Sequence, residues 1–122
     1  MKRYVDEPGS TAVAEAMSRA NGWFTCRVAY VETTRAVALA AGAVAARAFR
    51  ADWPALGVIE VDQALAESAA ELAVAHSLRS LDALHLAAAL VLPRDDLALM
   101  TWDRRLHAAA GAKSIAALPD EL

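Results

Sequence analysis

Apolar residues along the chain follow two patterns, long stretches with helical spacing and short runs of a few residues. The long stretches predict helices over residues 12–20, 27–41, 43–52, 63–76, 81–92 and 103–111. The short runs predict strands at 23–25, 56–61, 97–101 and 113–117, because they are apolar, brief and bounded by turn residues. Helices alternating with short apolar strands predict an α/β fold, with a parallel sheet covered by helices on both faces.

The ends of these elements carry signals of their own. Gly42 interrupts the apolar pattern between the second and third helices, and Asn21-Gly22 ends the first. N-caps are expected at Ser10 or Thr11, Thr25, Asp62 and Ser80. One feature departs from an ordinary α/β pattern, because the chain opens on a charged turn where a buried strand is usual.

Composition narrows the class of protein. With 122 residues, 57% hydrophobic and 22% charged, the chain is expected to form a single globular domain, residues 1–122. The net charge of −3 argues against a protein that coats nucleic acid, but it leaves open an enzyme that grips one phosphate through a metal ion. The lone Cys26, with no apolar leader and no uncharged stretch of bilayer length, predicts a cytoplasmic protein.

Three acidic residues stand at positions where the pattern makes a carboxylate unexpected. The first, Glu32, falls on the same helical face as Val28, Ala36 and Leu39. A carboxylate on such a face must be paired, hydrogen-bonded or bound to a metal. Two interpretations of Glu32 therefore stay open, an ion pair with Arg35 one turn away or a metal ligand.

The other two, Asp82 and Asp103, stand at predicted helix starts. Asp82 is the only acid in an otherwise apolar helix, so it is either a first-turn acid stabilised by the helix dipole or a functional group beside His85. Asp103 is either an N-cap or, at the carboxyl end of a strand, part of an α/β active site. Thr101 either orients a ligand or ends the strand. The remaining acids, Asp52 among them, fall in turns, at termini or on solvated faces.

Together the three acids indicate a metal site, because crowded carboxylates repel one another and are normally tolerated around a cation. All-oxygen ligation by Glu32, Asp82 and Asp103 would select Mg²⁺ or Mn²⁺ over zinc. Such an ion is suited to activating a water and binding a phosphodiester oxygen. His85 as a lone general base and Cys26 as a nucleophile have less support, and the five glycines are too scattered for a phosphate loop.

Four segments, in this order, resemble the PIN-domain family and especially the VapC-like toxins of bacterial toxin–antitoxin pairs. They are residues 2–10 (KRYVDEPGS), 31–36 (VETTRA), 81–89 (LDALHLAAA) and 101–106 (TWDRRL). The third segment is the most specific of the four, and together they span essentially the whole chain.

The resemblance implies a three-layer α/β/α fold with a mainly parallel central sheet. It implies a Mg²⁺- or Mn²⁺-dependent endoribonuclease whose acids activate water for attack on an RNA phosphodiester. Glu32, Asp82 and Asp103 match the family's second, third and fourth acids, and Thr101 matches the hydroxyl residue beside the last. The implied partners are RNA, a second copy in a homodimer, and an antitoxin protein whose tail covers the active site.

The chain departs from the family at its N-terminus. The family's first acid lies on a first strand within a YLDTSALVK segment, and Met1 stands where that segment has its valine. We therefore expect about nine ancestral residues to be missing, with a GTG valine codon read as the start. Upstream DNA that encodes no strand ending in an Asp-Thr or Asp-Ser motif would contradict this.

A missing first strand and first acid predict little ribonuclease activity and marginal stability for the chain, unless a partner fills the gap. This leaves an alternative from a different class, a catalytically silent PIN-like module that acts by binding protein or RNA. A third possibility is a DNA-directed or housekeeping PIN nuclease without an antitoxin.

Overall fold

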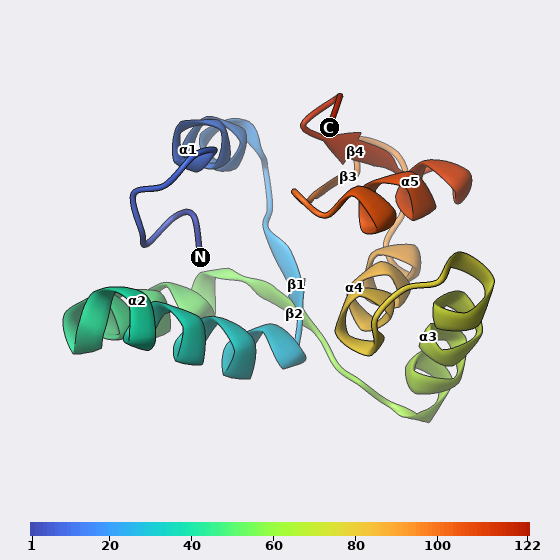
Figure 1. Ribbon diagram of the computed structural model, residues 1–122, viewed down its shortest axis with the longest axis horizontal. Coiled ribbons are helices and arrows are strands. Elements are labelled where there is room, and N and C mark those ends of the chain that lie inside the picture. The colour runs from blue at the N-terminus through green and yellow to red at the C-terminus, as the bar shows by residue number, and fades with distance from the viewer. The chain divides into compact units, whose positions relative to one another are not determined.

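The computed structural model describes residues 1–122 as two compact units, Met1–Ile59 and Glu60–Leu122. Each unit holds several helices and one pair of parallel strands (Figure 1). The units are described in turn below. The single domain over residues 1–122 stays a prediction.

The N-terminal unit is built around one strand pair and one long helix. Its elements are α1 (Ser10–Arg19), β1 (Phe24–Cys26), α2 (Val28–Asp52), the 3₁₀ helix η1 (Trp53–Ala55) and β2 (Gly57–Ile59). β1 runs parallel to β2, with Phe24 opposite Gly57. A Cβ on Gly57 would lie 2.5 Å from Cδ1 of Phe24, so a glycine at this position makes room for the aromatic ring.

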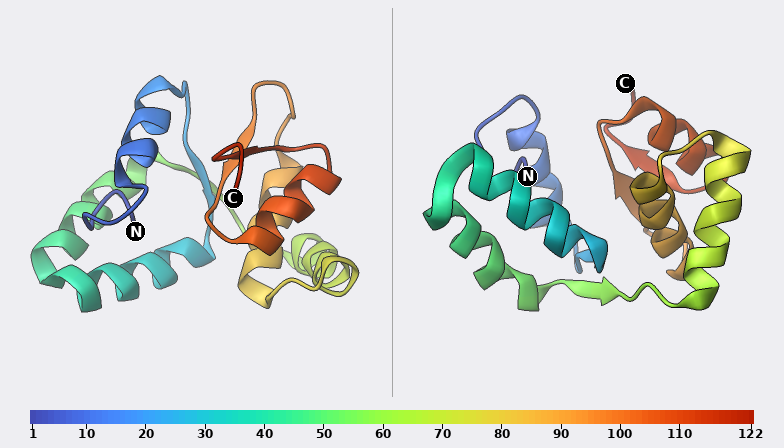
Figure 2. Two further views of the ribbon diagram at one scale, coloured as in Figure 1. Left: turned by 45° about the horizontal axis from the view of Figure 1, so that its top comes forward. Right: turned by 60° about the horizontal axis from the view of Figure 1, so that its bottom comes forward.

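Gly42 divides α2 into two halves. It adopts φ 85° and ψ −175°, a left-handed conformation that glycine reaches without the penalty a Cβ imposes. The ribbon of α2 bends sharply between its halves (Figure 2). The prediction of two helical stretches interrupted at Gly42 is therefore confirmed.

By length and composition alone, the helical segment Val28–Ala55 is long and apolar enough to cross a membrane. A single helix of this kind near an N-terminus is a weak indication, since core helices of soluble proteins pass the same test. The interruption at Gly42 argues against a span, because backbone groups left unbonded are costly in lipid.

Four aromatic rings join the N-terminal segment to α2 and η1. The buried ring of Phe49 lies 5.5 Å from that of Tyr4 and 5.6 Å from that of Trp53, both in edge-on geometry. Tyr30 makes a third edge-on contact, 5.1 Å from Trp53. Each such pair contributes about 0.5–1.5 kcal/mol beyond the area it buries. The rings thus supply apolar contact that the alanines of α2 are too small to provide.

The C-terminal unit is a stack of helices on its own strand pair. Its elements are α3 (Gln63–His76), α4 (Ser80–Val91), β3 (Ala98–Met100), α5 (Arg104–Ala112) and β4 (Ala116–Leu118). β3 runs parallel to β4, with Met100 opposite Leu118. α4 contacts both α3 and α5, and α5 contacts β4 (Figures 1 and 2).

α4 is the central helix of this unit, as its all-round apolar sequence predicts. Ala83, Leu86, Ala87 and Ala88 are all buried, and the Leu86 side chain is fully enclosed. Alanine at three of these four positions lets neighbouring helices approach closely. The unit's core therefore combines small residues on α4 with leucines on the helices around it, such as Leu72 and Leu106.

Of the predicted N-caps, Asp62 is confirmed. Its Oδ1 accepts a hydrogen bond from the backbone N–H of Leu65 at 2.8 Å, which satisfies one of the unpaired donors at the start of α3. The capping bond explains why α3 begins at Gln63, as expected from the sequence.

The caps predicted for α1, α2 and α4 are wrong. The N-caps of α1, α2 and α4 are Gly9, Arg27 and Arg79, and none makes a side-chain capping bond. Ser10 and Ser80 are instead the first residues of their helices, and Thr25 lies within β1. The Ser10 hydroxyl accepts from the N–H of Glu7 and donates to the carbonyl of Val5, so the preceding turn uses it instead of the helix.

The last strand lies later than the predicted 113–117. The backbone N–H of Lys113 still bonds to the carbonyls of Ala109 and Ala110, and Ser114 turns the chain with φ 62°. Ile115 is then buried, and pairing begins at Ala116. Lys113 and Ser114, which the pattern assigned to the strand, therefore form the end of α5 and the turn that follows it.

The α/β class with parallel strands is confirmed. Each unit contributes one parallel pair, β1 with β2 and β3 with β4. That the two pairs belong to a single central sheet stays a prediction. In the C-terminal unit, β3 leads directly into α5, which sets up the site described next.

Candidate functional site

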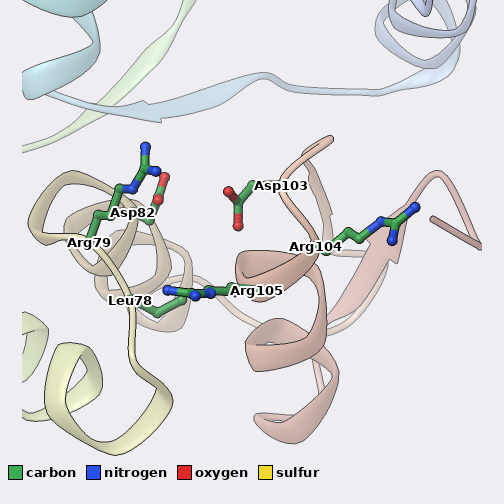
Figure 3. Close-up of a pocket in the computed structure, with 6 residues that line it drawn as sticks. All are labelled: Leu78, Arg79, Asp82, Asp103, Arg104 and Arg105. Atoms are coloured by element: carbon green, nitrogen blue, oxygen red, sulfur yellow. The ribbon is translucent and has the colours of Figure 1, made fainter.

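A pocket of about 300 Å³ lies where α4 and α5 begin, within the C-terminal unit. Figure 3 shows side chains from both helix starts around it. The six lining residues are Leu78, Arg79, Asp82, Asp103, Arg104 and Arg105. Two of the three acids singled out in the sequence, Asp82 and Asp103, therefore share one pocket.

Asp103 is positioned by the junction between β3 and α5. Thr101 extends the strand pairing by donating its N–H to the carbonyl of Leu118 at 2.9 Å, and its Oγ1 accepts from the N–H of Asp103 at 3.1 Å. Asp103 Oδ1 accepts from the N–H of Leu106 at 2.9 Å. Asp103 is thus the N-cap of α5, and this capping bond occupies one of its two carboxylate oxygens.

Thr101 orients the backbone of Asp103. It directly follows the last residue of β3, and its hydroxyl accepts from the N–H of Asp103. A role for Thr101 in orienting a ligand stays a prediction. Through that bond the hydroxyl helps to fix where the Asp103 carboxylate lies.

Asp82 stands in the first turn of α4 and is half-buried. The backbone amides at a helix start carry partial positive charge, which favours a carboxylate there. In Figure 3 its carboxylate and that of Asp103 extend from the two helix starts into the same space. His85, one turn further along α4, does not line this pocket.

Glu32 lies on α2 in the N-terminal unit, where it is half-buried. Leu39, expected on the same apolar face, is 71% exposed and lies just before the kink at Gly42. Within either unit, no three His, Cys, Asp or Glu side chains form a group that could hold a metal ion. The convergence of Glu32 with Asp82 and Asp103 stays a prediction.

The two carboxylates nevertheless fit Mg²⁺ or Mn²⁺. Both offer oxygen ligands, and Mg²⁺ is commonly held by one or two carboxylates together with water and substrate phosphates. No histidine or cysteine lines the pocket, which disfavours zinc. Two groups in this unit would hold the ion. One is the carboxylate of Asp82, and the other is the Asp103 oxygen that does not accept the capping bond.

The three arginines of the pocket were not predicted from the sequence. Arg79 is the N-cap of α4, and Arg104 and Arg105 form the first turn of α5. With the two aspartates they give the lining a formal charge of +1. Their positions in the sequence could have indicated them. Arg104 and Arg105 directly follow Asp103, and Arg79 directly precedes the helix that carries Asp82.

Asp52, which the pattern assigned to the ordinary acids, has a structural role in the N-terminal unit. Its Oδ2 accepts from the hydroxyl of Tyr4 at 2.8 Å and from Nε of Arg3 at 3.4 Å. Burial, reinforced by the hydrogen bond to Asp52, raises the pKa of Tyr4 to about 12. These contacts tie the N-terminal segment to the end of α2, and nothing about them indicates catalysis.

The chain is similar in sequence to a known family and to two ribonucleases. The PIN domain family matches residues 4–112 of the chain. Two proteins of Mycobacterium tuberculosis, ribonuclease VapC45 of strain CDC 1551 / Oshkosh and ribonuclease VapC49 of strain ATCC 25618 / H37Rv, are each 33% identical to it over 131 residues. Each alignment covers 100% of this chain and 91% of the relative.

Proposed function

This chain belongs to the PIN-domain family, and on that premise we propose that it is a metal-dependent endoribonuclease, the toxin of a toxin–antitoxin pair. The observation that carries the proposal is the pairing of Asp82 and Asp103 in one pocket at the starts of α4 and α5. The names of the two mycobacterial relatives support RNA as the substrate.

In the proposed site, Asp82 and Asp103 would hold Mg²⁺ or Mn²⁺. Glu32 stays the further ligand that the family resemblance implies. The ion, when bound, would polarise a phosphodiester oxygen and lower the pKa of a water that attacks the phosphorus. The chain's own contribution is to hold the carboxylates in place. Asp103 is fixed on both sides, by its capping bond to Leu106 and by the Thr101 hydroxyl, so little reorganisation is needed when a ligand arrives.

Metal binding is the primary test, because it probes the Asp82 and Asp103 carboxylates directly. Mn²⁺ titration followed by calorimetry should show binding that Asp82→Asn and Asp103→Asn each weaken. Loss of a ligand should cost at least as much as loss of an outer-shell partner, about 10–100-fold in affinity. Asp95→Asn is the matched control, since Asp95 is an exposed acid in the turn before β3 and does not line the pocket.

Asparagine is the informative replacement at position 103. Its side-chain oxygen also caps helices well, so Asp103→Asn keeps the start of α5 while removing the charge. A loss of Mn²⁺ binding with an unchanged melting temperature then separates ligation from capping. Binding by Asp103→Asn equal to wild type would contradict a ligand role for this residue.

Cleavage of a labelled single-stranded RNA in Mg²⁺ or Mn²⁺, with EDTA as the blank, tests the activity itself. Any cleavage of the RNA should depend on the metal and be lost in Asp82→Asn. A chain that neither binds Mn²⁺ nor cuts RNA would be the catalytically silent module, and cleavage of DNA but not RNA would favour the DNA-directed alternative.

The proposed partners are an antitoxin protein and a second copy of the chain, in the cytoplasm. Exposed apolar side chains on α2 support a protein partner, because large apolar side chains gathered on one element often mark an interaction surface. Val31, Leu39 and Val44 are 70%, 71% and 72% exposed. Light scattering of the purified chain tests the homodimer, and co-purification with the product of an adjacent gene tests the antitoxin.

A further inference from the structure

The pocket that holds Asp82 and Asp103 has arginines on both of its sides. Arg79 lines it from the start of α4, and Arg104 and Arg105 line it from the first turn of α5. A carboxylate pair alone would repel a polyanion, so the arginines decide what kind of ligand this surface accepts. The three arginines and two aspartates that line the pocket have a summed formal charge of +1. A divalent ion between the carboxylates would raise this charge to +3.

The three arginines are arranged differently. The Arg105 side chain runs towards Leu78 in Figure 3, and its Nη1 donates to the carbonyl of Ser77 at 3.4 Å. Arg105 thereby braces the turn before α4 against α5. Arg104 is exposed and extends away from both carboxylates, whereas Arg79 projects beside Asp82 (Figure 3).

We propose that Arg79 and Arg104 bind RNA backbone phosphates on either side of the Asp82–Asp103 pair, and that Arg105 positions the pocket wall between them. The guanidinium group matches the geometry of a phosphate and stays charged at any working pH. The inference rests on the proposed function, since it takes RNA as the substrate. It adds the residues that bind the RNA backbone, because negatively charged carboxylates cannot bind phosphates directly.

This arrangement also accounts for an acidic protein acting on RNA. The net charge of −3 gives no general attraction for a polyanion, so contact must be local. Phosphate contacts position a strand without reading its bases. The affinity that these arginines contribute should therefore be similar for RNAs of different sequence. Any sequence preference must arise from other contacts.

The experiment measures binding in EDTA, where metal-dependent cleavage cannot occur. Fluorescence anisotropy of a labelled single-stranded RNA of mixed sequence is recorded at several salt concentrations. Arg79→Ala and Arg104→Ala should each weaken binding about five- to tenfold at low salt and flatten the plot of log affinity against log salt by about 0.7. Arg104→Lys, which keeps the charge, should retain most of that slope.

Arg94→Ala is the matched control, because Arg94 is an exposed arginine of the same unit that does not line the pocket. It should bind RNA as wild type does. Melting temperatures confirm that the exposed Arg104 variants stay folded. Arg105→Ala should lower the melting temperature as well as the affinity, which distinguishes a brace from a direct contact.

Two outcomes would overturn the inference: no RNA binding by the wild-type chain, or Arg104→Ala binding as tightly as Arg94→Ala. Failure of the proposed ribonuclease is distinguishable from both. Arginine-dependent RNA binding without cleavage in Mg²⁺ or Mn²⁺ would uphold the arginine contacts and refute the activity. Metal-dependent cleavage with affinity unaffected by Arg79→Ala and Arg104→Ala would do the reverse.

Discussion

The two units are built from similar alanine-rich helices, yet they are stabilised in different ways. In α2, 25 residues long, only Val37, Ala46 and Phe49 are buried. In α4, only 12 residues long, four residues are buried. The N-terminal unit depends on a few large rings around Phe49, whereas the C-terminal unit depends on helices packed on both sides of α4.

The comparison shows that apolar composition does not determine burial. Alanine adds little area, so an alanine-rich helix is buried only where neighbours enclose it, as α3 and α5 do for α4. The same difference affects function. The pocket with two carboxylates lies on the well-packed unit, at the starts of α4 and α5.

The largest expected effect is from Phe49→Ala, which removes the centre of the aromatic cluster. It should cost about 3–5 kcal/mol in the free energy of unfolding, because a buried ring is replaced by a cavity. Urea unfolding measures the loss, and hydrogen exchange should rise mainly in peptides from Met1–Ile59. Faster exchange confined to Glu60–Leu122 would refute the proposed division of the two cores.

Leu86→Ala makes the complementary change in the C-terminal unit. Leu86 is fully buried on α4, so we expect a loss of about 2–5 kcal/mol, with exchange rising mainly in Glu60–Leu122. Leu39→Ala on α2 is the matched control, and its exposed side chain should change stability by no more than about 0.5 kcal/mol. Equal effects of the two leucine variants would show that burial does not distinguish these helices.

Asp103→Ala tests the junction on which the pocket depends. Removing the bond to the N–H of Leu106 should cost about 1 kcal/mol, while Asp103→Asn should cost only a few tenths because asparagine also caps. Thermal unfolding of both variants measures the difference. If alanine and asparagine were equally stable, the capping bond would contribute nothing to the fold.

An effect similar in size to that of Asp103→Ala is expected at the hydrogen bond between Tyr4 and Asp52. Tyr4→Phe should cost about 1 kcal/mol at neutral pH, because it removes the hydroxyl that donates to Asp52. The pKa of Tyr4 is raised in the folded state from 10.0 to about 12, so its contribution is complete below pH 10 and is lost as the pH rises towards 12. The difference between wild type and Tyr4→Phe should shrink across that window, and a constant difference would contradict the pKa shift.

Much of the fold follows from local sequence. Asp62 marked the start of α3, Gly42 marked the break in α2, and the apolar run from Leu81 marked a buried helix. These succeeded because the causes are local, a capping side chain, a residue that tolerates positive φ, and an apolar surface on every side. Predicted caps at Thr25 and Ser80 failed because a hydroxyl near a helix start need not face its amides.

The sequence predicted only some of the residues of the candidate site. Asp82 and Asp103 were found as acids at helix starts, and the family motifs gave them a common role. Arg79 and Arg104 were missed because nothing in local sequence tells whether an arginine beside an acid faces a pocket or the solvent. The tie between Tyr4 and Asp52 was also missed, since 48 positions separate them along the chain.

By itself, the sequence determined the helices and strands, the parallel α/β class, the membership in the PIN-domain family and the identity of the candidate acids. These depend on periodicity, turn residues and ordered motifs, all of which are properties of neighbouring positions. Only the tertiary structure decided that Asp82 and Asp103 share a pocket with three arginines, and that α4 rather than α2 is enclosed. Both depend on which helix starts and faces are packed together, and contacts between distant segments leave no periodic trace in the chain.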